Sequence, residues 1–162
     1  TLVPMSKASA RNETTLGAMS IYARQLATGL SDGTYSGITE AGTAGAALIF
    51  GDIVYLAVAD SRWELVDADA AATSGYVKVG CCVLAAAGDG SATTILLFGN
   101  VRANAAFPTM TVGKQQFISQ TPGDIVEDVS GYGTDDVIRC VGFANTADEL
   151  FFCPSPDYLT HV

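Results

Sequence analysis

The feature that most constrains the fold of this chain is a succession of short apolar runs separated by turn residues. The clearest case is the pair of runs Val77 to Ala87 and Ala92 to Phe98, which flank Gly88-Asp89-Gly90. Glycine and aspartate readily adopt the turn conformations that join two antiparallel strands, so this stretch predicts a β-hairpin. Pro122-Gly123 fits the central pair of a type II turn, in which proline fixes the first φ and glycine accepts a positive second φ.

Similar short runs continue along the chain and predict further strands. They are Ala47 to Phe50, Asp52 to Val58, Arg62 to Val66, Val101 to Ala103, Gln116 to Ser119, Asp124 to Glu127, Val137 to Ala144 and Glu149 to Cys153. About ten short strands with closely spaced turns are typical of an all-β barrel or sandwich. The exception is Asp67 to Thr73, where alanines favour a short helical turn and the leading aspartate could cap it.

The two ends of the chain lack the regular succession of apolar runs and turns seen in the middle part. Residues 1–34 indicate an N-terminal arm or attachment segment, within which 18–27 favours a strand over a helical turn. The Gly- and Thr-rich stretch from Thr28 to Ala46 predicts a loop that is longer than the usual connection. Pro154-Ser-Pro156 should take the chain out of the sheet. We therefore expect a β-barrel-like module over 35–158 and a C-terminal tail over 159–162, with a mobile His161.

Composition and charge exclude several classes of protein. Hydrophobic residues make up 49% of the chain, which excludes a disordered protein, and no apolar run has the roughly 20 residues that span a bilayer. The net charge of -9 and the scattered eight Lys and Arg disfavour contact with phosphate backbones. We therefore expect neither a nucleic-acid nor a membrane partner.

The four cysteines of the chain contain no C-x-x-C pair. The default interpretation is buried free thiols rather than a zinc site or a disulfide framework. The adjacent Cys81 and Cys82 would point to opposite faces of a strand, so the two cannot pack in the same core layer.

Asp67 and Asp69 are weak candidates for a metal site, because Asp67-Ala-Asp-Ala-Ala resembles the start of a calcium loop. The remaining pattern fails: Ala71 occupies the fifth position, Ala72 replaces the turn glycine, and Lys78 falls where a bidentate glutamate is needed. The two aspartates are better interpreted as the polar entry to a short helical turn, and we expect no metal and no cofactor.

Enzymatic motifs are equally incomplete. Gly29-Leu-Ser-Asp-Gly33 matches the nucleophile elbow G-x-S-x-G, and His161 follows later in the chain. That elbow needs a strand before Ser31 and a helix after it, whereas a Gly-rich loop is expected here. Acid pairs such as Glu127-Asp128 and Asp135-Asp136 could serve a glycosidase, but the sequence selects none of them. We therefore expect no catalytic residues, with a serine or carboxylate hydrolase as the least favoured alternative.

A resemblance covers about residues 35–158. The order and spacing of several segments are similar to those of β-rich modules of tailed-bacteriophage virion proteins, which occur at the C-terminal ends of tail-fibre-like proteins and in head-decoration-like proteins. The segments are Gly51-Asp-Ile-Val-Tyr-Leu, Trp63 with Asp67-Ala-Asp-Ala-Ala, Leu96-Leu-Phe-Gly-Asn-Val-Arg102, Thr111-Val-Gly-Lys, Ser119-Gln-Thr-Pro-Gly-Asp, Ile138-Arg-Cys-Val-Gly-Phe-Ala and Leu150-Phe-Phe-Cys-Pro-Ser-Pro-Asp-Tyr158.

The resemblance implies a non-enzymatic structural or adhesive part of a virion. The expected partners are further copies of the chain, in a homotrimer, and other virion proteins of the capsid, fibre or tail. An alternative from a different class is a carbohydrate-binding receptor module that recognises a host surface glycan through tyrosines, carboxylates and amides. The residues expected to form the structural core are Trp63, Tyr55, Leu96, Phe98, Val141 and Phe151.

Overall fold

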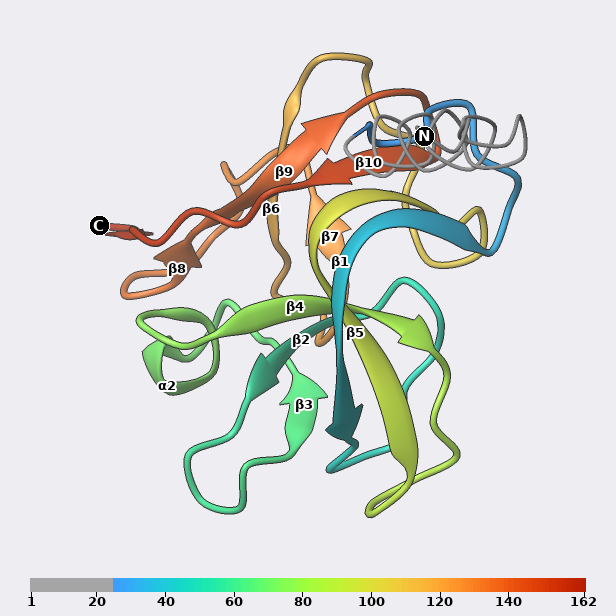
Figure 1. Ribbon diagram of the computed structural model, residues 1–162. Helices are drawn as coiled ribbons and strands as arrows, with labels where there is room; N and C mark the ends of the chain where they lie inside the picture. Colours follow the sequence, from blue (N-terminus) through green and yellow to red (C-terminus); the bar gives the residue numbers. More distant parts are fainter. Residues whose placement is uncertain (1–24) are drawn as a thin grey trace, which may run out of the picture.

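The computed structural model describes residues 25–162. Eleven strands and one short helix make up these residues (Figure 1). The bounds are β1 Thr34–Thr43, β2 Ile53–Leu56, β3 Trp63–Leu65, α2 Ala71–Ser74, β4 Val79–Leu84, β5 Ala92–Arg102, β6 Gln115–Ile118, β7 Ile125–Val126, β8 Val137–Ile138, β9 Cys140–Ala144, β10 Glu149–Phe152 and β11 Leu159–Thr160. A curled nine-stranded antiparallel sheet dominates, and β8 and β11 form a separate two-stranded sheet. The predicted all-β fold is confirmed.

Strand β5 organises the large sheet. Along one edge it pairs with β1 over its whole length. On the other edge, β4 pairs with residues 94–96 and β10 with residues 99–102. Because a strand has only two edges, β4 and β10 occupy successive parts of the same edge of β5. The sheet therefore divides into a first half-sheet (β3-β2-β4) and a second half-sheet (β10-β9-β6-β7), which diverge from the shared strand β5 (Figure 1).

The sequence of β5 marks the place where it passes from one half-sheet to the other. Thr39 pairs with Leu96 and Ile38 with Phe98, which leaves Leu97 as the extra residue of a β-bulge. Beside the bulge, Gly37 pairs with Gly99. Gly99 has φ +144°, and a Cβ added to it would lie 2.2 Å from the Ser36 carbonyl oxygen, so only glycine fits this close approach.

Two apolar cores lie on opposite faces of the first half-sheet. The larger core lies on the face that includes Ile53, Cys81 and Leu96, and residues of the second half-sheet such as Val141 belong to the same cluster. The smaller core lies on the other face and contains Trp63, Cys82 and Ile95. Strands β2, β4 and β5 are therefore covered on both faces in this half-sheet. The opposite orientation of Cys81 and Cys82 is confirmed.

The predicted hairpin around Gly88-Asp89-Gly90 is confirmed by the pairing of β4 with β5. Gly123, between β6 and β7, has φ +84°, the sign that the predicted type II turn requires. The predicted loop over 28–46 is wrong in its second half, because Thr34–Thr43 forms β1. The strand predicted over 18–27 falls largely outside the described residues.

The helical turn is shorter than predicted, and Asp67 does not cap it. Helix α2 covers only Ala71–Ser74, and its N-cap residue Ala70 makes no side-chain capping bond. Asp67 instead accepts a hydrogen bond from the Asp69 backbone N–H at 3.0 Å, which closes a local Asx turn before the helix.

The C-terminal residues return to the fold after β10 and pair with β8. The chain leaves the large sheet after β10, as the prolines predict, but Leu159–Thr160 then pairs with β8. His161 donates its backbone N–H to the Asp136 carbonyl at 2.8 Å and accepts from the Asp135 N–H at 2.9 Å. The tail predicted over 159–162 thus lies against β8 and the Asp135-Asp136 turn, and the mobility of His161 stays a prediction.

Three of the six predicted core residues, Trp63, Leu96 and Val141, are fully buried. Tyr55 is partly buried against the larger core, and its hydroxyl donates to Glu64 at 2.9 Å. Phe98 is 41% exposed, so its placement in the core is wrong. The bulge at Leu97 is the reason, since it reverses the side-chain alternation between Leu96 and Phe98. Phe151 is half-buried on the same outward side as Phe98.

Candidate binding surfaces

The outer face of the second half-sheet and adjoining β1 carries a row of apolar side chains, which we call the apolar stripe: Ile38, Phe98, Phe143 and Phe151. Ile38 is paired with Phe98, and Phe151 with Phe143, so each pair projects from the same face. The rings of Phe98 and Phe151 meet edge to face, with centroids 5.2 Å apart. Ile38, Phe98 and Phe143 are 64%, 41% and 40% exposed. Among residues 25–162, no side chain therefore covers this aliphatic and aromatic surface completely.

The segment that precedes β1 covers the next row of the same face. The Ala27 carbonyl accepts a hydrogen bond from Asn100 Nδ2 at 2.7 Å, and the Leu30 N–H donates to Glu149 at 2.8 Å. Asn100 and Glu149 are consequently buried, although they alternate with inward-facing residues. The stripe is thus bordered on one side by chain that is already fixed to the sheet.

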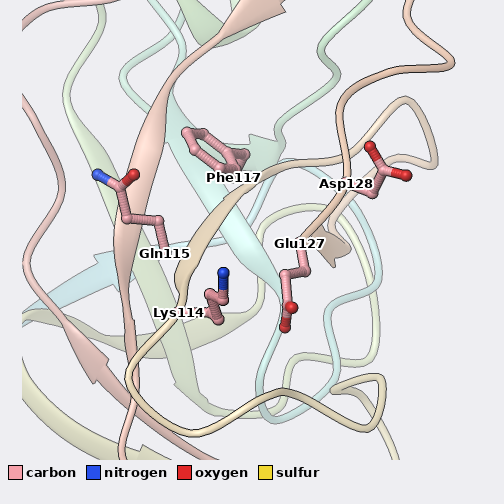
Figure 2. A pocket seen from close by; sticks show the side chains of 5 residues that line it. All are labelled: Lys114, Gln115, Phe117, Glu127 and Asp128. Atoms are coloured by element: carbon pink, nitrogen blue, oxygen red, sulfur yellow. The ribbon is translucent and has the colours of Figure 1, made fainter.

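A second surface feature is a groove over β6, which we call the β6 groove. It consists of two adjacent depressions that share Gln115 and Phe117. The first has a volume of about 320 Å³ and is also lined by Lys114, Glu127 and Asp128 (Figure 2). The second has a volume of about 430 Å³ and is completed by Ile138, Cys140, Ser155, Asp157, Tyr158 and Leu159.

Backbone turns hold the carboxylates of the first depression. Glu127 accepts the Thr111 N–H at 2.9 Å, and this bond lowers the pKa of the Glu127 carboxyl. Asp128 accepts the Ser130 N–H at 2.9 Å, which lowers the pKa of Asp128 in the same way. Both groups are ionised at neutral pH. Figure 2 shows them on the side of the depression opposite Gln115.

The second depression is more apolar and contains a thiol. Burial raises the pKa of the Cys140 thiol, so this side chain is a neutral part of the wall at neutral pH rather than a nucleophilic thiolate. Tyr158 is held in place by the edge of Tyr76, with ring centroids 4.7 Å apart. Both depressions are therefore lined by side chains in defined positions, although they come from distant parts of the sequence.

The structure does not place Ser31 in a nucleophile elbow, whereas it brings the Glu127-Asp128 pair to one side of the first depression (Figure 2). Ser31 stands at the turn into β1, where its carbonyl accepts the Thr34 N–H at 3.2 Å, and a strand rather than a helix follows it. The Asp136 carboxylate is engaged by the Gly133 N–H at 2.6 Å and by Gln120 at 2.8 Å, and so serves the local turn.

The weak metal candidates, Asp67 and Asp69, belong to no group of ligands. Among residues 25–162, no three His, Cys, Asp or Glu side chains lie in an arrangement that could hold a metal ion. The β6 groove, in contrast, was not predicted from the sequence. Its residues come from β6, the end of β7, strands β8 and β9, and the C-terminal segment, and no local motif links these places.

Comparison of the chain with protein-family models, with curated proteins and with solved structures gives no match. In the described part of the chain, no helix has the length and apolar character needed to cross a membrane.

Proposed function

We propose that this protein is a non-enzymatic structural module of a bacteriophage virion that associates with further copies of itself on the particle, as a fibre tip or a capsid decoration. The observation that carries the proposal is the apolar stripe. Soluble monomeric proteins rarely expose large contiguous apolar patches, and patches of this kind are typical of interaction surfaces. The order of segments over 35–158, which resembles virion modules, supports the assignment to a particle.

Charge does not oppose association through this face. The chain as a whole carries a net charge of -9, but the four side chains of the stripe are uncharged. Nearby Arg102 is already paired with Asp148 at 2.7 Å. A second copy can therefore cover the stripe without burying an unpaired charge. Each fully buried phenylalanine contributes about 1.5–3 kcal/mol, so a few rings suffice to stabilise a contact between subunits.

The proposal is tested by measuring the mass of the purified full chain by analytical ultracentrifugation, together with immunogold labelling of intact particles. We expect an oligomer, with a trimer as the specific expectation, and labelling at a fixed place on the particle. Phe143→Asp should shift the mass toward the monomer, because it places a charge in the interface.

Val58→Asp is the matched control. Val58 is 94% exposed in the turn between β2 and β3, so a charge there should leave the mass unchanged. A wild-type chain that stays monomeric at high concentration and is absent from particles would contradict the proposal. Equal dissociation in both variants would show that the stripe is not the interface.

A further inference from the structure

We infer that the β6 groove binds a neutral oligosaccharide that carries N-acetyl groups. The groove adjoins the apolar stripe, because Gln115 is paired with Phe143, but the inference does not depend on self-association. The two depressions meet at Phe117 and Gln115, so a ligand longer than one sugar ring could occupy both of them. Sites for small ligands typically combine an apolar floor with a few polar groups that set orientation, and the groove has both.

The charges of the groove select against anionic ligands. Glu127, Asp128 and Asp157 line its two depressions, against one lysine, Lys114. The hydrogen bonds to Glu127 and Asp128 keep these two carboxylates ionised at neutral pH. A phosphate or a sialylated glycan would be repelled by this excess of negative charge. Sugar hydroxyls, in contrast, can donate hydrogen bonds to carboxylates.

The aromatic residues provide the apolar counterpart. Phe117 borders both depressions, and Tyr158 stands in the second one, braced by Tyr76 at a ring-centroid distance of 4.7 Å. A pyranose ring has an apolar face of C–H groups that can pack on an aromatic ring, while its hydroxyls point sideways toward polar groups. This pairing of ring faces with a polar rim fits a sugar better than a purely apolar ligand.

The second depression suggests why the sugar should be N-acetylated. Ile138, Cys140 and Leu159 are apolar parts of its lining, which gain nothing from a hydroxyl but can contact a methyl group. Gln115 and Ser155, which line the same depression, supply an amide and a hydroxyl that can pair with the acetamido group. An N-acetyl group presents both chemistries within one small substituent.

The test is a titration of the full chain with chitotriose, the N-acetylglucosamine trimer, monitored by NMR chemical-shift changes, with maltotriose and trilysine as comparison probes. We expect saturable binding of chitotriose that is at least about ten-fold tighter than that of maltotriose. Phe117→Ala and Gln115→Ala should each weaken it by about ten-fold. Val58→Ala, in the turn between β2 and β3, is far from both depressions in the fold and should leave it unchanged.

Gln115 is exposed, so its variant keeps the test valid if Phe117→Ala unfolds the chain. The inference would be overturned by no saturation with chitotriose at millimolar concentration, or by equal affinity for maltotriose. Tighter binding of trilysine than of chitotriose would also overturn it, since the carboxylates would then select cations. If the wild-type chain binds chitotriose but does not self-associate, only the proposed function is contradicted.

Discussion

Replacing Arg139 should destabilise the protein more than any other change of a charged side chain that we consider. Arg139 is only 5% exposed, and burial lowers the pKa of its guanidinium. No carboxylate pairs with it among the described residues. Its donors go to backbone carbonyls instead: Nε to Ser155 at 2.8 Å, and Nη1 to Val77 at 2.9 Å, to Ser74 at 3.2 Å and to Gly75.

Arg139 lies between β8 and β9. Its hydrogen bonds connect this part of the chain to the C-terminal segment and to the residues at the end of α2 and after it. Hydrogen bonds to a charged group contribute about 1.5–3 kcal/mol each, but three of the four share Nη1 and are not additive. The cost of burying the guanidinium offsets part of the gain. We therefore expect Arg139→Met, which keeps most of the side-chain stem, to lower the free energy of unfolding by about 2–4 kcal/mol.

The assay is urea unfolding followed by the fluorescence of Trp63, the only tryptophan of the chain. Arg139→Lys should lose less stability than Arg139→Met, since its ammonium retains some of the donors but cannot reach in two directions at once. The control is Arg62→Met. Arg62 is partly exposed and bonded to Asp60 and Asp89, and such surface pairs contribute little to stability.

A free energy of unfolding for Arg139→Met within about 0.5 kcal/mol of the wild-type value, with an unchanged denaturant slope, would refute this reasoning. Such a result would mean that water replaces the guanidinium at all four carbonyls without loss. Equal losses in Arg62→Met and Arg139→Met would refute it as well, because they would show that burial does not distinguish the two arginines.

Three further changes test other parts of the fold. Trp63→Ala should lower the free energy of unfolding by about 3–5 kcal/mol, measured by chemical denaturation with circular dichroism, because the ring is 2% exposed in the smaller core. Gly99→Ala should cost at least about 1–3 kcal/mol in the same assay, and a neutral effect would show that the β1–β5 contact can yield. Burial raises the pKa of Asp124, and burial together with the charge of Asp124 raises the pKa of Asp52. A carboxyl whose pKa is raised in the folded state adds stability below its ordinary value of 3.8 and loses it as the pH rises. Asp124→Asn should therefore raise the melting temperature at pH 7 but not at pH 3, and a lower value at pH 7 would contradict this.

The parts of the fold that could be predicted from sequence are those in which local chemistry decides the conformation. The β4–β5 hairpin follows from Gly88-Asp89-Gly90, and the turn before β7 follows from Pro122-Gly123. The opposite faces of Cys81 and Cys82 follow from strand geometry alone. Each of these predictions uses residues that are close together in the sequence.

The predictions that failed depend on distant contacts. Strand β1 has no apolar alternation to mark it, and it is a strand because β5, far along the chain, provides its partner. Phe98 lies two residues from Leu96, a spacing that puts both side chains on one face of a regular strand, but the bulge that turns Phe98 outward exists only in the pairing with β1. The β6 groove could not be predicted for the same reason. Phe117 and Tyr158 line one depression because β11 pairs with β8, which is a contact between distant parts of the sequence.

The sharing of β5 between the two half-sheets has a consequence for how the protein withstands force. A force applied to either half-sheet is transmitted to β5, because both half-sheets are hydrogen-bonded to it. Strand β1 is paired with β5 along its full length. The antiparallel ladder between β1 and β5 then bears the load in shear, with its hydrogen bonds acting together instead of breaking one after another. We expect the two half-sheets to unfold in one step rather than separately when the chain is stretched.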